Sequence, residues 1–242
     1  AEGAEAIHEE FPGNILKQHT YYQGSMAAAV SQPDLVYLDK YYRSERVSHC
    51  HIESCTSFAY EEGGRIVVVS STQIPHIVRR VIGQALGQPW GRFRVIKPYI
   101  GGGFGNKQDV LYEPLNAWVC QQLGGRCVKL ALSREEVFEC TRCRHAIDFH
   151  IRAWARKDGT LVARDIKAHS DQGAYASHGH AIVANSVTNM RNIYPDELAL
   201  AQQAFTVYTT STTAGAMRAY GVPQAAFAME CLMDDLARKL NL

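Results

Sequence analysis

Hydrophobic positions recur along this chain with two periods, one typical of strands and one typical of helices. Runs rich in aromatic and β-branched residues predict a hairpin of strands 57–60 and 65–69, with its turn at Glu62-Gly63-Gly64. A helix capped near Ser71 or Thr72 follows and ends at Gly87. The apolar face of this helix is made of Ile77, Val78, Val81, Ile82, Ala85 and Leu86.

The same two periods predict the elements of the middle of the chain. Strands are expected at 93–96 and 127–132, and a short helix begins at Ser133. Between the two strands the sequence has the pattern of a second helix. Its apolar positions are Val110, Leu111, Leu115, Trp118, Val119 and Leu123.

The two ends of the chain differ in character. Residues 1–45 are polar and irregular apart from a strand near 35–41, and they resemble a linker that enters the domain. Toward the C-terminus, two long strands flank a hairpin turn at 157–160, and a helix over 223–240 closes the chain. We therefore expect an α+β fold with mixed sheets and packed helices, in which one domain spans residues 46–242.

Composition narrows the class of protein. With 242 residues and 46% hydrophobic content, the chain can bury a large core without disulfides. Lysine and arginine (25) balance aspartate and glutamate (24), which argues against nucleic acid or an anionic membrane as partner. No apolar run approaches the ~18 residues of a membrane helix, and the start of the chain lacks a signal sequence. The odd count of seven cysteines favours a reducing compartment, so we expect a soluble, cytoplasmic protein.

The segment Gly101-Gly102-Gly103-Phe104-Gly105-Asn106-Lys107 is the strongest candidate for a binding site. Glycines permit positive φ angles and let backbone amides approach an oxyanion or a planar ligand closely. The spacing fits neither G-x-G-x-x-G nor the nucleotide P-loop. A strand, a glycine loop and a helix start together suggest an anion or cofactor site, although a flexible turn without a ligand has the same local sequence.

The cysteines and histidines give weaker signals. Cys140-x-x-Cys143 lacks the second pair of ligands that a zinc site needs, and Cys50 with Cys55 lacks the continuation of an iron–sulfur motif. His49-x-His51 and His178-x-His180 have no third ligand at matching spacing. Structural roles are the simpler interpretation for all of these residues.

Two motifs roughly a hundred residues apart resemble one known family. The stretch from Pro98 to Asp109 and the segment Thr213–Gln224 are similar to the molybdenum-binding subunit of the xanthine dehydrogenase family. The resemblance covers nearly the whole chain from about His49. It also includes Ser71–His76, Leu132–Glu136, Arg144-His145 and Gly173-Ala174-Tyr175.

The resemblance implies a molybdenum-pterin cofactor and residues that hold it. Its backbone contacts fall on Gly102, Gly103, Phe104 and Gly105, and the guanidinium of Arg218 is expected to anchor the pterin. A cation is disfavoured at the N-terminus of the helix near Pro223, which favours a ligand-binding role for Arg218 over a purely surface one. A branched side chain at Gly103 or Gly105 is expected to cost cofactor occupancy rather than stability.

The resemblance also implies a substrate side similar to that of purine-oxidising members. Phe104 and Tyr220 match the two aromatic residues that sandwich the ring, and Gln108 and Arg144 match the polar residues at its edge. The family often has glutamate where this chain has Gln108. The glutamine that the family places near the metal falls at about Val47, so that contact is displaced or missing.

The implied reaction hydroxylates a carbon beside a ring nitrogen of a xanthine- or hypoxanthine-like heterocycle, with oxygen from water. The base and the iron–sulfur and FAD modules are expected outside this chain, on the remainder of the subunit or on partner subunits, so the isolated fragment is expected to be inactive. Two other function classes remain. One is a non-catalytic nucleotide-binding or assembly module, and the other is a related hydroxylase of aldehydes or nicotinate. A reductase of aromatic thioesters would need an iron–sulfur insertion that the sequence does not show.

Overall fold

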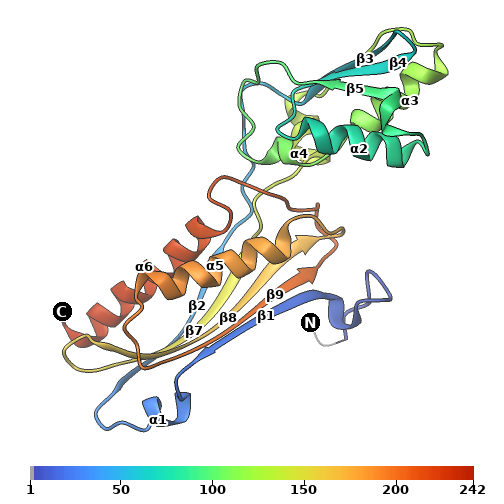
Figure 1. The fold of residues 1–242 in the computed structure, drawn as a ribbon. Coiled ribbons are helices and arrows are strands. Elements are labelled where there is room, and N and C mark those ends of the chain that lie inside the picture. Colours follow the sequence, from blue (N-terminus) through green and yellow to red (C-terminus); the bar gives the residue numbers. More distant parts are fainter. Residues whose placement is uncertain (1–2) are drawn as a thin grey trace. The chain divides into compact units, whose positions relative to one another are not determined.

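Each of the two β-sheets in the computed structural model, which describes residues 3–242, belongs to its own unit of the chain (Figure 1). The first unit contains residues 1–47, 144–214 and 219–242. The second unit contains residues 48–143 together with the short segment 215–218. Among the described residues, no helix is both long and apolar enough to cross a membrane.

The first unit is built on a five-stranded sheet of order β1-β9-β8-β7-β2. All neighbouring strands are antiparallel except β8 and β9, which are parallel. The bounds of the strands are β1 Ile15–Gln23, β2 Val36–Ser44, β7 Ile147–Ala155, β8 Leu161–Gly173 and β9 Ala199–Tyr208. β7 and β8 form the predicted long hairpin, and the crossover from β8 to β9 runs through a helix, as a parallel pair requires.

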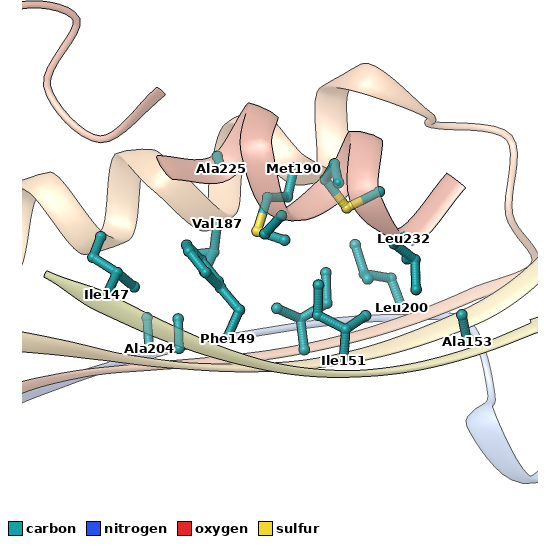
Figure 2. Close-up of a cluster of buried hydrophobic side chains, with 14 of the residues drawn as sticks. Ile147, Phe149, Ile151, Ala153, Val187, Met190, Leu200, Ala204, Ala225 and Leu232 are labelled. Atoms are coloured by element: carbon teal, nitrogen blue, oxygen red, sulfur yellow. The ribbon is translucent and has the colours of Figure 1, made fainter. Parts of the chain in front are cut away.

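Two helices cover one face of this sheet, α5 (Gly179–Ile193) and α6 (Val222–Leu240) (Figure 1). Figure 2 shows the core between them and the sheet, where Phe149 and Ile151 of β7 face Val187 and Met190 of α5. Alternate residues of β7 are buried because successive side chains of a strand point to opposite faces. A third helix, α1 (Met26–Val30), packs against β8 and β9 through Ala29.

A buried ion pair joins β8 to the segment between α5 and β9. Arg164 on β8 donates to both carboxylate oxygens of Glu197 at 2.6 Å, and both side chains are shielded from solvent. The same guanidinium donates at 2.9 Å to the carbonyl oxygens of Met190 and Tyr194, at the end of α5. Its hydrogen bonds therefore satisfy helix-terminal carbonyls that would otherwise lack partners.

The second unit has a four-stranded sheet of order β5-β4-β3-β6, in which β4 and β5 are parallel and the other pairs antiparallel. The bounds of the strands are β3 Thr56–Glu62, β4 Arg65–Ser70, β5 Phe93–Ile96 and β6 Val128–Ala131. Helices α2 (Pro75–Ala85) and α3 (Glu113–Gln122) close its core over Ile66, Val68 and Phe93. α4 (Arg134–Cys140) begins with a capping box between Ser133 and Glu136.

The predicted α+β class with mixed sheets is confirmed, and so are the hairpin β3–β4, the long hairpin β7–β8, and helices α2, α4 and α6. The expected linker is wrong, because residues 15–23 and 36–44 are strands of the five-stranded sheet. β1 was not predicted, because apolar and polar residues do not alternate in its sequence and most of its side chains are exposed. α5 and β9 were also missed.

The apolar face predicted for α3 also differs from the face that the structure buries. Leu115, Trp118 and Leu123 are about half exposed, whereas Glu113, Asn116, Ala117 and Cys120 are buried. Polar partners explain the reversal, because Glu113 accepts a hydrogen bond from Ser70, and Asn116 donates one to Ser57. The buried face of α3 thus includes polar side chains with hydrogen-bond partners, whereas hydrophobicity alone predicted leucine and tryptophan on that face.

We expect Glu197→Gln to lower the free energy of unfolding by about 3–5 kcal/mol, because it leaves the buried Arg164 cation without its counter-charge. Urea unfolding of the variant measures this loss. The control is Asp234→Asn, since Asp234 pairs with Arg238 at 3.7 Å and both side chains are largely exposed to solvent, where such pairs contribute about 0.5 kcal/mol or less. Equal losses in the two variants would contradict a special role for the buried pair.

Candidate functional site

The glycine loop of the second unit connects β5, which ends at Ile96, to α3, which begins at Glu113. Its backbone takes positive φ angles at Gly102 (99°), Phe104 (53°) and Gly105 (108°). Left-handed φ angles close to one another along a chain turn successive amides toward one side and form an anion-binding concavity. Phe104 holds such an angle without being glycine, and strain of this kind concentrates at functional sites.

Three successive amides of this loop are left without an acceptor. The backbone N–H groups of Gly102, Gly103 and Phe104 donate no hydrogen bond to another residue within 3–242. The amide of Gly105, in contrast, donates to Gln73 Oε1 at 3.0 Å, and that of Gly101 donates to Glu53 Oε2 at 2.8 Å. The loop therefore presents a run of unpaired donors between two anchored ends, as an anionic ligand requires.

Glu53 and Lys107 close the base of the loop. The ammonium of Lys107 lies 2.5 Å from Glu53 Oε2, and the lysine side chain is only 1% exposed. The backbone of Glu53 also donates to the carbonyl oxygen of Gly101 at 3.2 Å. Burial alone would raise the pKa of Glu53, but the hydrogen bonds from Lys107 and Gly101 outweigh it and hold that pKa below its usual value. Glu53 is therefore ionised and ties both ends of the loop together.

Two histidines before the loop are structural, as the sequence suggested. The neutral ring of His51 donates through Nδ1 to the carbonyl of Glu53 at 2.5 Å and accepts at Nε2 from Asn106 at 2.9 Å. Burial, followed by the charges of Lys107 and Arg134, lowers the pKa of His51. His49 donates through Nε2 to the carbonyl oxygen of Ala216 at 2.7 Å. No group of three or more histidine, cysteine or acidic residues in the described chain is placed to hold a metal ion.

The two motifs that the sequence singled out meet in the second unit. The amide of Arg218 donates to the carbonyl oxygen of Phe104 at 2.9 Å, which joins residues 215–218 to the middle of the glycine loop. Arg218 is exposed, and it precedes the first residue of α6, Val222, by four positions. The guanidinium thus extends from the backbone that borders the unpaired amides.

The glycines are required by the protein itself. A Cβ atom at Gly105 would lie 2.4 Å from the carbonyl oxygen of Ala216, and one at Gly103 would lie 2.5 Å from Gln73 Oε1. At Gly105 the neighbouring atoms are backbone, so we expect a larger residue there to cost stability, contrary to the sequence-based expectation, whereas at Gly103 the neighbour is the end of the Gln73 side chain. Sequence alone could not show it, because the colliding atoms come from segments distant in the chain.

The remaining predicted substrate residues are divided between the units. Gln108 lies in the second unit beside Lys107, whereas Arg144 and Tyr220 belong to the first. Arg144 donates to Gln224 Oε1 at 3.1 Å, and burial lowers its pKa. Val47, where the family's glutamine was expected, has a half-exposed side chain.

Tyr220 is held in an unusual conformation within the first unit. Ala219, Tyr220 and Gly221 all have positive φ angles, and the first two are not glycine. The hydroxyl of Tyr220 lies 2.8 Å from His178 Nδ1, and Asn185 donates to its carbonyl oxygen at 2.7 Å. The backbone strain is thus offset by hydrogen bonds from α5 and its N-terminal cap. Sequence reasoning missed Asn185 and assigned His178 no specific partner.

His145 is a buried titratable group in the first unit. Its ring is inaccessible to solvent, with Nε2 lying 3.3 Å from Gln172 Oε1. Burial lowers the pKa of His145 to about 4, although the hydrogen bond with Gln172 opposes this shift. The imidazole is therefore neutral at physiological pH.

The fold and this loop define a domain with a run of unpaired backbone amides, an arrangement that suits an anionic ligand. More particularly, the chain belongs to the molybdopterin cofactor-binding domain family, whose model matches residues 7–242. The resemblance found in the sequence is thereby confirmed. The match also begins well inside the segment expected to be a linker.

Curated relatives and solved structures that resemble this chain support the same family. The chain is 48% identical over its whole length to the putative xanthine dehydrogenase molybdenum-binding subunit XdhA of Escherichia coli K12, and covers 32% of it. It is 34% identical to the nicotinate dehydrogenase large molybdopterin subunit of Eubacterium barkeri, covering all of this chain and 56% of that one. The aldehyde oxidoreductase structure from Desulfovibrio gigas superposes with a TM-score of 0.89 at 27% identity, over 100% of this chain and 26% of that chain. The chain thus spans about a third of the xanthine dehydrogenase subunit.

Gly105→Ala is expected to destabilise the second unit by roughly 2–5 kcal/mol, through the strain of a positive φ and the collision with Ala216. Gly64→Ala is the matched control, because Gly64 also has a positive φ but a Cβ there would meet no atom within 4 Å. It should cost only about 1–2 kcal/mol. Denaturant unfolding of both variants makes the comparison, and equal losses would show that the loop tolerates a side chain.

Acid is expected to destabilise the protein through His145. Between about pH 6.5 and pH 4 the unfolded chain binds a proton at this imidazole that the native state excludes, so stability present above pH 6.5 is lost as the pH falls. Over that window the wild type should lose about 3 kcal/mol more unfolding free energy than His145→Asn. His180→Asn, at an exposed position, should keep the wild-type pH dependence. A parallel pH profile for His145→Asn would refute this assignment.

Proposed function

We propose that the chain is the cofactor-binding part of a molybdenum hydroxylase, with the glycine loop and Arg218 holding the molybdenum-pterin cofactor. The observation that carries this proposal is the run of unpaired amides at Gly102, Gly103 and Phe104 beside the backbone of Arg218. A planar, multiply anionic ligand is bound best by several fixed N–H donors and a guanidinium fork. These residues therefore fit the group that the family binds.

The bound cofactor would supply the two-electron chemistry and the activated oxygen, while the protein supplies position and electrostatics. The amides of residues 102–104 would hold the anionic part of the cofactor without any change of charge during turnover. Arg218 would add a permanent positive charge beside them. The Glu53–Lys107 pair and Gln73 would keep the loop in shape while its central amides are committed to the ligand.

For the substrate we propose a purine-like heterocycle, since the 48% identical relative is named a xanthine dehydrogenase subunit. Phe104 is 46% exposed and offers a ring face for stacking, and the amide of Gln108 can donate to or accept from the edge of a heterocycle. Tyr220 and Arg144 are the other two residues that the family resemblance assigns to the substrate, and both belong to the first unit. Nicotinate or an aldehyde is the alternative substrate, because relatives with those names share the fold.

The whole enzyme would contain more than this chain. The xanthine dehydrogenase relative is about three times as long, and we propose that its remaining part corresponds to the rest of the molybdenum subunit, including the catalytic base. Iron–sulfur and FAD subunits or domains would remove the electrons, in the cytoplasm. The 242-residue chain alone would accordingly bind without hydroxylating substrate.

Arg218→Lys tests the proposal in the complete enzyme. The substitution keeps the charge but loses the planar fork, which should remove about 1.5–3 kcal/mol of charge-assisted hydrogen bonding. Hypoxanthine turnover and bound molybdenum, measured by kinetics and elemental analysis, should fall about tenfold or more, since about 1.4 kcal/mol is a factor of ten. Arg238→Lys, at an exposed arginine on α6, should change neither.

A wild-type enzyme without molybdenum, or with unchanged metal content in Arg218→Lys, would overturn the cofactor assignment. A wild-type enzyme that contains molybdenum but oxidises nicotinate or an aromatic aldehyde in preference to hypoxanthine would overturn only the substrate. The two measurements therefore separate cofactor from substrate.

A further inference from the structure

A second concave site lies in the second unit, on the side of α2 and β5. It is a cavity of about 320 Å³ whose lining residues come from the start of β4, the start of α2, and β5 with the residue after it. Phe93, Val95 and Pro75 provide apolar surface. The polar lining residues are Arg65, His76, Arg79, Arg94 and Lys97.

The charged residues that line this cavity are all cationic. Four of its lining residues are lysine or arginine, and no aspartate or glutamate lines it. The sequence has the same bias, since the stretch from Gly63 to Gln108 contains seven lysines and arginines and no acidic residue. In a chain whose net charge is only +1, such a concentration is a local feature and not a general excess of cations.

The cations of the cavity are also poorly neutralised. Several cations elsewhere in the described chain have close carboxylate partners, as in the pairs Lys107–Glu53, Arg142–Asp109 and Arg164–Glu197. In the cavity, Arg94 reaches Glu62 only at 3.7 Å, and both side chains are more than half exposed to solvent, where such a pair contributes little. Arg79 uses its Nε–H on the carbonyl of Trp90 at 3.0 Å, which leaves the outer end of its fork available.

The start of α2 adds to the positive potential. Its N-terminal cap, Ile74, provides no side-chain hydrogen bond, and Pro75 has no N–H, so the amide of His76 is the first donor of the helix. That amide has no acceptor among the described residues. A helix of eleven residues directs the positive end of its dipole into this region.

From these observations we propose that the cavity binds a small, multiply charged phosphate-bearing ligand, independently of the cofactor loop. Guanidinium forks and a helix N-terminus are the groups that recognise phosphate oxygens. Cations from three separate elements line one small concave volume, which suits a compact anion better than an extended acidic peptide. The volume is also at the lower end of the range of small-molecule sites.

The test titrates the full-length protein with pyrophosphate, ADP and adenosine at low salt by isothermal titration calorimetry. Pyrophosphate and ADP should bind with one site per chain, their affinity should weaken as salt is added, and adenosine should not bind. The double variant Arg79→Gln/Arg94→Gln should weaken pyrophosphate binding at least tenfold. A thermal melt of each variant checks that it is folded.

Two controls locate the site. Arg80→Gln/Arg126→Gln removes the same charge from exposed positions of the second unit that do not line the cavity, and should leave the affinity within twofold. Arg218→Gln, which alters the proposed cofactor site, should also leave it unchanged. Absence of saturable binding, equal weakening by both double variants, loss of binding in Arg218→Gln, or binding of an acidic peptide but not of pyrophosphate would each overturn the proposal.

Discussion

A loop whose central backbone amides stay unpaired cannot use them to hold itself together, and this constraint shapes the glycine loop of the second unit. Gly102, Gly103 and Phe104 keep their N–H groups unpaired, so side chains from other segments must fix the loop. Glu53 ties its two ends through Gly101 and Lys107, and Gln73 holds its middle at Gly105. Pre-formed donors lower the cost of ordering the site when the ligand binds.

The buried lysine shows how this arrangement is stabilised. An ammonium removed from water is costly unless it is paired and hydrogen-bonded, and Lys107 has both the carboxylate and the carbonyl of Glu53 as partners. In the first unit Arg164 and Glu197 form an equivalent pair that orders the end of α5 and the turn into β9. Each unit therefore has an ion pair with a fully buried cation where an irregular segment must take one conformation.

The glycines of this loop let neighbouring segments pack closely, whereas the sequence suggested that they let a ligand approach the backbone. The bare backbone at residues 103 and 105 lets Gln73 and Ala216 approach within distances that a Cβ atom would forbid. The amides of the central residues Gly102, Gly103 and Phe104 meanwhile have no acceptor. The glycines thus permit the close packing that shapes the loop.

The sequence by itself determined the elements that have strong local signals and the motifs that identify the family. The hairpin at Glu62-Gly63-Gly64, the short helix that begins at Ser133 and the closing helix were all predicted, because turn signals and periodicity are encoded within a few neighbouring residues. The glycine loop was proposed as a binding site from residue type and spacing, and Arg218 from the resemblance to the family.

Only the tertiary structure decided what depends on contacts between distant segments. β1 is a strand because it pairs with β9, although its own side chains are mostly polar. The sequence has 24 acidic residues, and no pattern in it distinguishes Glu53 from the others. Only the fold places Glu53 beside Lys107. The reversed face of α3 depended on polar partners at Ser57 and Ser70, in strands that local periodicity cannot relate to the helix. Burial and ion pairing are properties of the assembled chain, which is why sequence patterns alone did not determine them.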